Sequence, residues 1–105
     1  MRILFDQGTP VPLRASLPGH SVSTAFELGW SSLANGELLS KAEQGGFELL
    51  LTTDQNLRYQ HNLSTRQIAI VVLRTTSWPR IRQQIEAVRA AVERAGVGSY
   101  EEVEF

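Results

Sequence analysis

Short apolar runs alternate along this chain with longer segments whose apolar residues are three or four positions apart. The most apolar run, Ile68–Leu73, contains no polar residue. A run of this length is typical of a buried strand in a parallel sheet, because helices cover both faces of such a strand. It is far shorter than the ~20 residues that a membrane-spanning helix needs. We therefore expect an α/β protein with no membrane association.

The other segments follow the same alternation of strands and helices. Strands are expected at 2–6, 21–25, 47–52, 67–73 and 100–105, with the second and the last at edges of the sheet. Helices are expected at 9–17, 36–44 and 79–95, with one helical turn inside 53–63. Thr9 and Asn35 are the expected N-caps of the first two helices. The pattern predicts a single three-layer α/β domain over residues 1–105, with a mostly parallel central sheet of four to five strands.

Composition excludes several classes of chemistry. The 105-residue chain has no cysteine, which rules out disulfides, thiolate nucleophiles and cysteine-bound metal centres. Its 42% hydrophobic and 20% charged residues are ordinary for a folded domain. The N-terminus carries no apolar segment of the kind that directs secretion, so we expect a cytoplasmic protein.

Three carboxylates are expected near one edge of the sheet. Asp6 and Asp54 are the only aspartates, and each comes at or just after the end of an apolar strand. Glu37 lies in the first turn of the helix expected at 36–44. Ligand sites in open parallel sheets form at the carboxyl ends of the strands. Grouped carboxylates there would suit Mg²⁺ or Mn²⁺, which prefer oxygen ligands and can activate water against a phosphodiester.

Each of these carboxylates also has a purely structural interpretation. Asp54, followed by Gln55-Asn56-Leu57, can cap the next turn, and Asp6 can cap the turn at Gln7-Gly8. A glutamate in a first helical turn is favourable through the helix dipole alone. Both interpretations stay open at the level of the sequence.

The basic residues are unevenly distributed. Nine of the ten are arginine, and six of these lie between Arg58 and Arg89, whereas the last five residues are mostly acidic. Arg58, Arg74 and Arg80 are closest to the expected carboxyl edge, which makes them the candidates for phosphate contacts. His20 and His61 fall in separate polar segments and are expected at the surface.

Three segments in order resemble the small PIN-like proteins of bacteria. They are Ile3–Gln7 with Pro10, Asn35–Leu39 and Leu50–Leu57, and the resemblance covers roughly residues 1 to 90. That group is related to the PIN-domain toxin ribonucleases of toxin–antitoxin systems and to the Mut7-C family. The resemblance implies a central parallel sheet and a ribonuclease that depends on Mg²⁺ or Mn²⁺. It also implies an RNA substrate and an antitoxin protein as partner.

Carried over by position, the resemblance makes Asp6, Glu37 and Asp54 both the metal ligands and the catalytic residues. Some positions depart from the family pattern, because polar residues stand where relatives often have acidic ones. These secondary candidates are Gln7, Asn56, Thr75, Thr76 and Ser77. Fewer carboxylates predict weaker metal binding. The alternative function is a degenerate PIN-like module that binds RNA or a protein without cutting.

A phosphoreceiver domain is a second alternative, because it also places aspartates at strand ends. That class of domain needs an acidic pair after the first strand and a late lysine, whereas here Gln7 follows Asp6 and the only lysine is Lys41. The alanines of the helix expected at 79–95 extend its apolar surface, and PIN-like proteins commonly pair. We therefore expect a homodimer.

Overall fold

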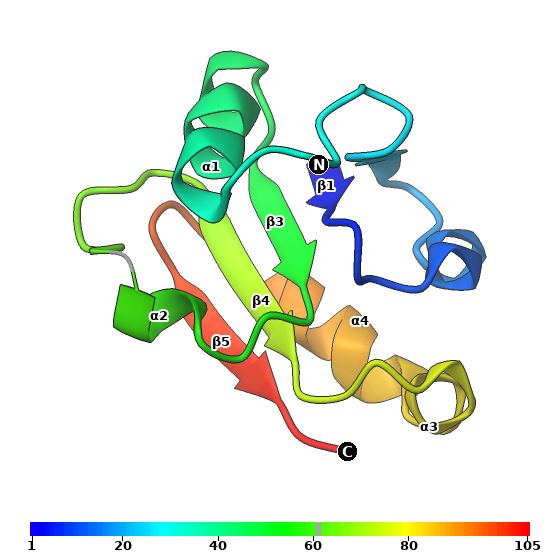
Figure 1. The fold of residues 1–105 in the computed structure, drawn as a ribbon. Helices are drawn as coiled ribbons and strands as arrows, with labels where there is room; N and C mark the ends of the chain where they lie inside the picture. The colour runs from blue at the N-terminus through cyan, green and yellow to red at the C-terminus, as the bar shows by residue number, and fades with distance from the viewer. Residues whose placement is uncertain (61) are drawn as a thin grey trace.

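The computed structural model describes residues 1–60 and 62–105 (Figure 1). His61 lies outside the described residues. Five parallel strands form one sheet in the order β2-β1-β3-β4-β5. The strands are β1 (Arg2–Phe5), β2 (Ser21–Thr24), β3 (Leu49–Thr52), β4 (Ala69–Leu73) and β5 (Tyr100–Val103). This confirms the expected parallel sheet, including the edge positions of β2 and β5.

Helices cover both faces of the sheet and make three layers. They are the 3₁₀ helix η1 (Val11–Ser16) and the α-helices α1 (Asn35–Gln44), α2 (Leu57–Gln60), α3 (Trp78–Gln83) and α4 (Ile85–Arg94). Phe5 packs with residues of η1, α3 and α4 on one face, and its neighbour Leu4 packs with α1 and α2 on the other. Alternate side chains of a strand point to opposite faces, so every central strand contributes to both cores. Figure 1 shows the two helical layers on either side of the strands.

The strand order fixes where a site can form. The chain passes from β1 to β2 on one side of β1 and then returns to β3 on its other side. In sheets of this kind, the reversal opens a crevice beyond the carboxyl ends of the two strands that flank it. Those ends are Phe5 in β1 and Thr52 in β3, where Phe5 pairs with Leu51. Asp6 directly follows the end of β1, and Asp54 comes two residues after the end of β3.

The prediction of one continuous helix over 79–95 is wrong, because two helices, α3 and α4, cover this segment. Gln84 adopts φ −123° and ψ 31°, outside helical values, and separates α3 from α4. The two parts contact different neighbours, since α3 meets η1 whereas α4 meets β4 and β5. Ile81 and Ile85, on either side of the break, still pack against the same core, which explains why the apolar spacing runs through it.

Both expected N-caps are also wrong. Pro10 precedes η1 and Ala34 precedes α1, and neither supplies a side-chain cap. The polar side chains of Thr9 and Asn35 bond elsewhere, to residues at the ends of β1 and β3. Both departures have the same cause, because these side chains take part in the candidate site.

The alanine-rich side of α4 is largely used inside the protomer. Ala91 is buried in the core, and Ala87 and Ala95 pack against it. Ala90 is likewise only partly buried, and the homodimer stays a prediction. None of the helices in residues 1–60 and 62–105 combines the length and apolar character that crossing a membrane requires.

Candidate functional site

Asp6 and Asp54, which we call the acid pair, are joined through one threonine hydroxyl at the ends of β1 and β3. Thr52 donates its hydroxyl hydrogen to Asp6 Oδ2 and accepts the backbone N–H of Asp54 at 3.0 Å. The side chain of Thr52 is buried, so neither bond competes freely with water. One residue at the last position of β3 thus fixes both carboxylate-bearing segments.

The other oxygen of Asp6 has a partner that can be replaced. Thr9 Oγ1 lies 2.8 Å from Asp6 Oδ1 and 2.9 Å from the backbone oxygen of Leu51. Because a hydroxyl carries a single hydrogen, Thr9 can donate to either acceptor. Asp6 Oδ1 can therefore bind another ligand while Thr9 keeps a hydrogen bond to Leu51.

The turn after β1 approaches β3 closely. A Cβ atom added at Gly8 would lie 2.6 Å from Thr53 Oγ1, a distance that side chains do not tolerate. Glycine at this position lets the turn bring Asp6 against the end of β3. Asp6 N also donates to the Leu51 carbonyl at 3.2 Å, which continues the pairing of the two strands by one residue.

Asp54 is held by a turn and by α1. Its Oδ1 accepts the backbone N–H of Asn56 at 3.0 Å, which is the local capping role that the sequence allows. Its Oδ2 accepts from Asn35 Nδ2 at 2.5 Å. The structural interpretation of Asp54 is thereby confirmed, but it accounts for only one of the two oxygens. The second is positioned by a helix far away in the sequence.

The acid pair has no basic side chain as a direct partner in the described chain. Every side-chain partner of Asp6 and Asp54 named above is a neutral hydroxyl or amide, and within residues 1–60 and 62–105 no basic side chain forms an ion pair with either. Burial raises the pKa of Asp6 above its ordinary value. The Thr52, Thr9 and Gly8 hydrogen bonds oppose this rise, and the nearby charge of Asp54 adds to it. A bound cation would favour the charged carboxylate and so oppose this rise.

Glu37 does not join the acid pair. Its side chain is exposed near the start of α1 and faces a shallow hollow shared with Ser40, Lys41 and Gln44. In the described part of the chain no three acidic or histidine side chains are grouped closely enough to hold a metal ion. The expected cluster of three carboxylates is thus not formed. The reason is local, because α1 turns Asn35 and Leu38 toward Asp6 and leaves Glu37 on its outer side.

Two pockets meet at Asp6 and Gln7. The first, of about 140 Å³, lies between the turn after β1 and the segment leading into α1, with Trp30 and Asn35 in its wall. The second, of about 220 Å³, lies on the η1 side, with Arg14 and Phe26 in its wall. Gln7 is exposed and borders both pockets. A substrate at Asp6 therefore has a recess on either side of it.

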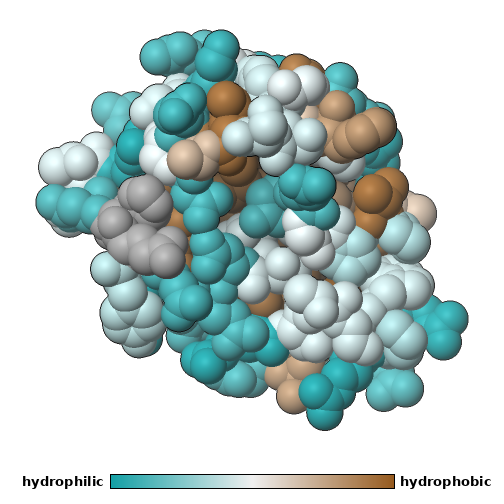
Figure 2. Space-filling view, in the orientation of Figure 1, coloured by the Kyte–Doolittle hydropathy of each residue, from teal (hydrophilic) through white to brown (hydrophobic). Residues whose placement is uncertain are grey.

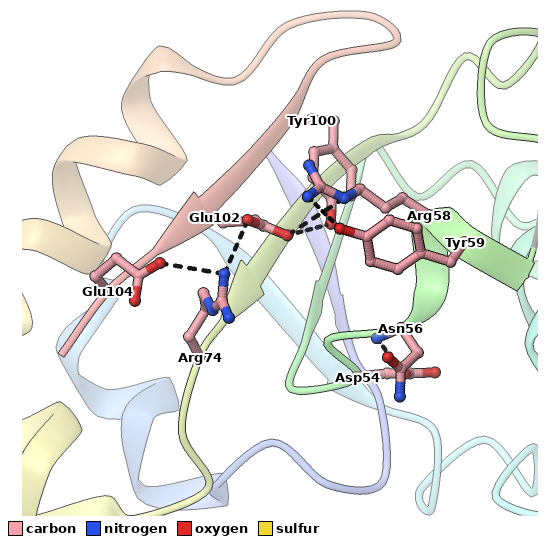
Figure 3. Close-up of polar contacts among 8 residues, drawn as sticks. All are labelled: Asp54, Asn56, Arg58, Tyr59, Arg74, Tyr100, Glu102 and Glu104. Atoms are coloured by element: carbon pink, nitrogen blue, oxygen red, sulfur yellow. Dashed lines mark hydrogen bonds and ion pairs between the residues drawn. The ribbon is translucent and has the colours of Figure 1, made fainter.

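The expected phosphate-binding arginines are mostly engaged elsewhere. Figure 3 shows a group on β5 and α2 that we call the Glu102 cluster. It consists of Arg58, Tyr59, Arg74, Tyr100, Glu102 and Glu104. Arg74 lies 3.3 Å from carboxylate oxygens of both glutamates, and Arg58 Nε lies 3.8 Å from Glu102. Two of the three candidate arginines thus already face carboxylates of the same chain.

The remaining secondary candidates shape the backbone or lie on the surface. Thr75 Oγ1 accepts the backbone N–H of Ser77 at 3.1 Å, and Ser77 Oγ accepts that of Arg80 at 3.4 Å to cap α3. The side chains of Thr76 and Arg80 are exposed. Within the described chain, no hydrogen bond or ion pair joins these residues to the acid pair.

Sequence reasoning missed Thr9, Thr52 and Asn35 as parts of the site. A threonine at the last position of an apolar strand, two residues before an aspartate, was a usable signal for Thr52. The other two resemble ordinary N-caps, and only the fold shows that their side chains turn toward the acid pair. No family model, no curated protein and no solved structure matches this chain.

Proposed function

We propose that the protein hydrolyses phosphodiester bonds in RNA with the help of a Mg²⁺ or Mn²⁺ ion held by the acid pair. The observation that carries the proposal is that neither Asp6 nor Asp54 is paired with a basic side chain in the described chain, although both lie at the switch point of a parallel sheet. Mg²⁺ commonly takes only one or two protein carboxylates and completes its coordination with water and substrate phosphate. Two carboxylates are therefore a sufficient protein contribution.

The residues around the acid pair have roles that suit this chemistry. Thr52 orients Asp6 Oδ2, and Thr9 can release Asp6 Oδ1 without losing its own hydrogen bond. Asn35 and the backbone of Asn56 restrain Asp54. When bound, the cation supplies activation of water and neutralisation of phosphate charge. The chain itself supplies fixed anionic oxygens at the end of a rigid sheet, so little reorganisation is needed on binding.

RNA as the substrate rests on the resemblance of the three segments to PIN-like proteins. The crevice at the ends of β1 and β3 supports it by offering an open approach with a recess on each side of Asp6. The antitoxin partner stays a prediction of the resemblance alone.

The test is cleavage of single-stranded RNA by identically purified variants, with Mn²⁺, with Mg²⁺ and with a chelator. We expect Asp6→Asn and Asp54→Asn to lose more than the ~10–100-fold that outer-shell substitutions cost. Glu37→Gln is the matched control, because its charge change is identical and its side chain lies outside the acid pair. It should keep activity close to wild type.

Equal cleavage by wild type and Asp6→Asn would indicate a contaminating nuclease and would contradict the proposed function. Loss of activity in Glu37→Gln would instead restore the three-carboxylate set that the resemblance implies. If neither wild type nor any variant cleaves RNA but wild type binds it, the degenerate binding module becomes the better description.

A further inference from the structure

The pocket of about 220 Å³ beside Asp6 has features of a binding site that the acid pair does not use. It lies between the turn after β1 and the loop after β2. Its volume is below the ~300–1,000 Å³ of a site for a drug-sized ligand, which suits a single small ring system. Asp6 itself is part of the wall, so a ligand here would be adjacent to the reacting phosphate of the proposed function.

An exposed aromatic ring stands at this pocket. Phe26 has 78% of its surface exposed and Val11 has 56%, both unusual for large apolar side chains. Brown and tan atoms lie at the upper right of Figure 2, over the part of the molecule where Figure 1 draws the blue and cyan segments. A phenylalanine face open to solvent is a surface on which an unpaired base can stack.

The loop that carries Phe26 is restrained. The Phe26 carbonyl accepts the N–H of Gly29 at 3.1 Å, and Trp30 N donates to the Ala25 carbonyl at 2.8 Å. Gly29 has φ +74°, a left-handed conformation that glycine adopts without strain. The ring is thus presented by a closed turn, which lowers the entropy lost when a ligand stacks on it.

An ion pair between Arg14 and Glu27 forms part of the polar wall of the pocket. Arg14 donates to both carboxylate oxygens of Glu27, and Thr24 N donates to Glu27 Oε1 at 2.9 Å. These contacts hold the pKa of Glu27 below its ordinary value, so it is a pure acceptor at neutral pH. Oε2 receives only one of these bonds, from Arg14 at 3.2 Å, and retains a lone pair for an N–H donor.

We infer that this pocket binds one unpaired nucleobase of the substrate strand, stacked on Phe26, with its exocyclic amino group donating to Glu27. The inference rests on the proposed function, since the acid pair would hold the adjoining phosphate. A base with an amino group, such as cytosine, fits the acceptor at Glu27, whereas uracil presents a carbonyl oxygen at the same position.

The probe is a fluorescently labelled, short single-stranded oligocytidylate, with oligouridylate as its comparison. Binding is measured by anisotropy with Mg²⁺ present, before cleavage is visible on a gel. Phe26→Ala should weaken binding about tenfold, the loss of one base stack, while Phe26→Tyr stays close to wild type. Val97→Ala is the matched control, because Val97 is 87% exposed and lies away from this pocket.

Wild type should also prefer oligocytidylate, and Glu27→Gln should reduce that preference. Circular dichroism checks that each variant is folded. Unchanged binding by Phe26→Ala, or no binding of either probe by wild type, overturns the inference. Equal affinity for both probes overturns the amino-group contact.

The outcomes separate this pocket from the proposed function. If cleavage depends on the cation but Phe26→Ala leaves both cleavage and binding unchanged, the ribonuclease proposal is supported and the base-binding pocket is contradicted. If binding depends on Phe26 but wild type cleaves RNA with neither cation, the base-binding pocket is supported and the ribonuclease proposal is contradicted.

Discussion

The acid pair and the Glu102 cluster are two groups of carboxylates on the same sheet with opposite charge balance. Asp6 and Asp54 are surrounded by neutral donors, whereas Glu102 faces Arg58 and Arg74 and accepts the hydroxyl of Tyr100 at 2.9 Å. Figure 3 shows Asp54 apart from the cluster, at the turn that follows β3. Similar residue types have thus been placed in two different electrostatic environments.

The partners of Glu102 are all supplied by its own chain. The carboxylate of Glu102 already has cations and a hydroxyl from its own chain as partners. Burial of Tyr100, followed by its hydrogen bond to Glu102, raises the pKa of that tyrosine to about 12. A saturated group of this kind holds β5 and α2 together and has little to gain from a new partner. The two aspartates of the acid pair have no basic partner in the described chain, and in the proposed function an external cation supplies the positive charge.

Among the substitutions that compare the acid pair with the Glu102 cluster, we expect Thr52→Val to have the largest effect on cleavage and stability. The substitution removes the hydroxyl that serves Asp6 and Asp54 together, so cleavage should fall about 10–100-fold. Stability should fall by about 1 kcal/mol, because the Asp54 N–H loses its acceptor. Thr52→Ser should restore both properties in kinetic and thermal-melting assays, and Thr76→Val, at an exposed site, serves as the control. Full activity in Thr52→Val would remove its positioning role.

A cation should stabilise the protein through the acid pair alone. At a concentration ten times its Kd, Mg²⁺ or Mn²⁺ adds about 1.4 kcal/mol to the free energy of unfolding. For a domain of this size that is a rise in Tm of roughly 5–10 °C. Glu102→Gln should keep this rise, whereas Asp6→Asn should lose it. A rise that survives in Asp6→Asn would place the cation elsewhere.

Substituting Glu102 should have a smaller effect on stability. The side chains of Arg58 and Arg74 are 45% and 37% exposed, so solvent screens their ion pairs with Glu102. We expect Glu102→Gln to cost less than about 1 kcal/mol in chemical denaturation. It should also release Arg58 and leave Arg74 paired with Glu104 alone, so that RNA binding becomes tighter and more dependent on salt. A loss of RNA affinity would show that the cluster orders a surface that RNA needs.

The smallest effect is a pH dependence of the cation-free protein. The pKa of Asp6 is higher in the folded state than in the unfolded chain, so its contribution to stability is complete below the unfolded pKa. That contribution is lost as the pH rises through the folded pKa of Asp6. Thermal melts with chelator, compared between wild type and Asp6→Asn, should show this loss in wild type only. With a cation bound, the trend should disappear.

The sequence predicts the frame of the molecule better than its site. Apolar runs such as Ile68–Leu73 predict buried parallel strands because no polar residue interrupts them. The aspartates that follow two of the strands indicate that both lie at the same edge of the sheet. The contributions of Thr9 and Asn35 are not predictable in this way. Each is a good local cap, and tertiary packing overrides that preference by offering a distant acceptor, the Leu51 carbonyl for Thr9 and the Asp54 carboxylate for Asn35. The prediction that Glu37 joins the two aspartates was wrong because the side of α1 on which Glu37 lies depends on where the helix begins.

The pairing of β1 with β3 also sets an order of events during synthesis. Asp6 and the Thr52 that orients it are 46 residues apart in the chain. At ~5–20 residues per second, a ribosome needs several seconds to deliver the second after the first. During that interval the N-terminal carboxylate has neither its hydroxyl partner nor Asp54, so a nascent chain carries no acid pair. A nuclease built this way would be inert beside its own messenger RNA until the middle strand has been released and has joined the sheet.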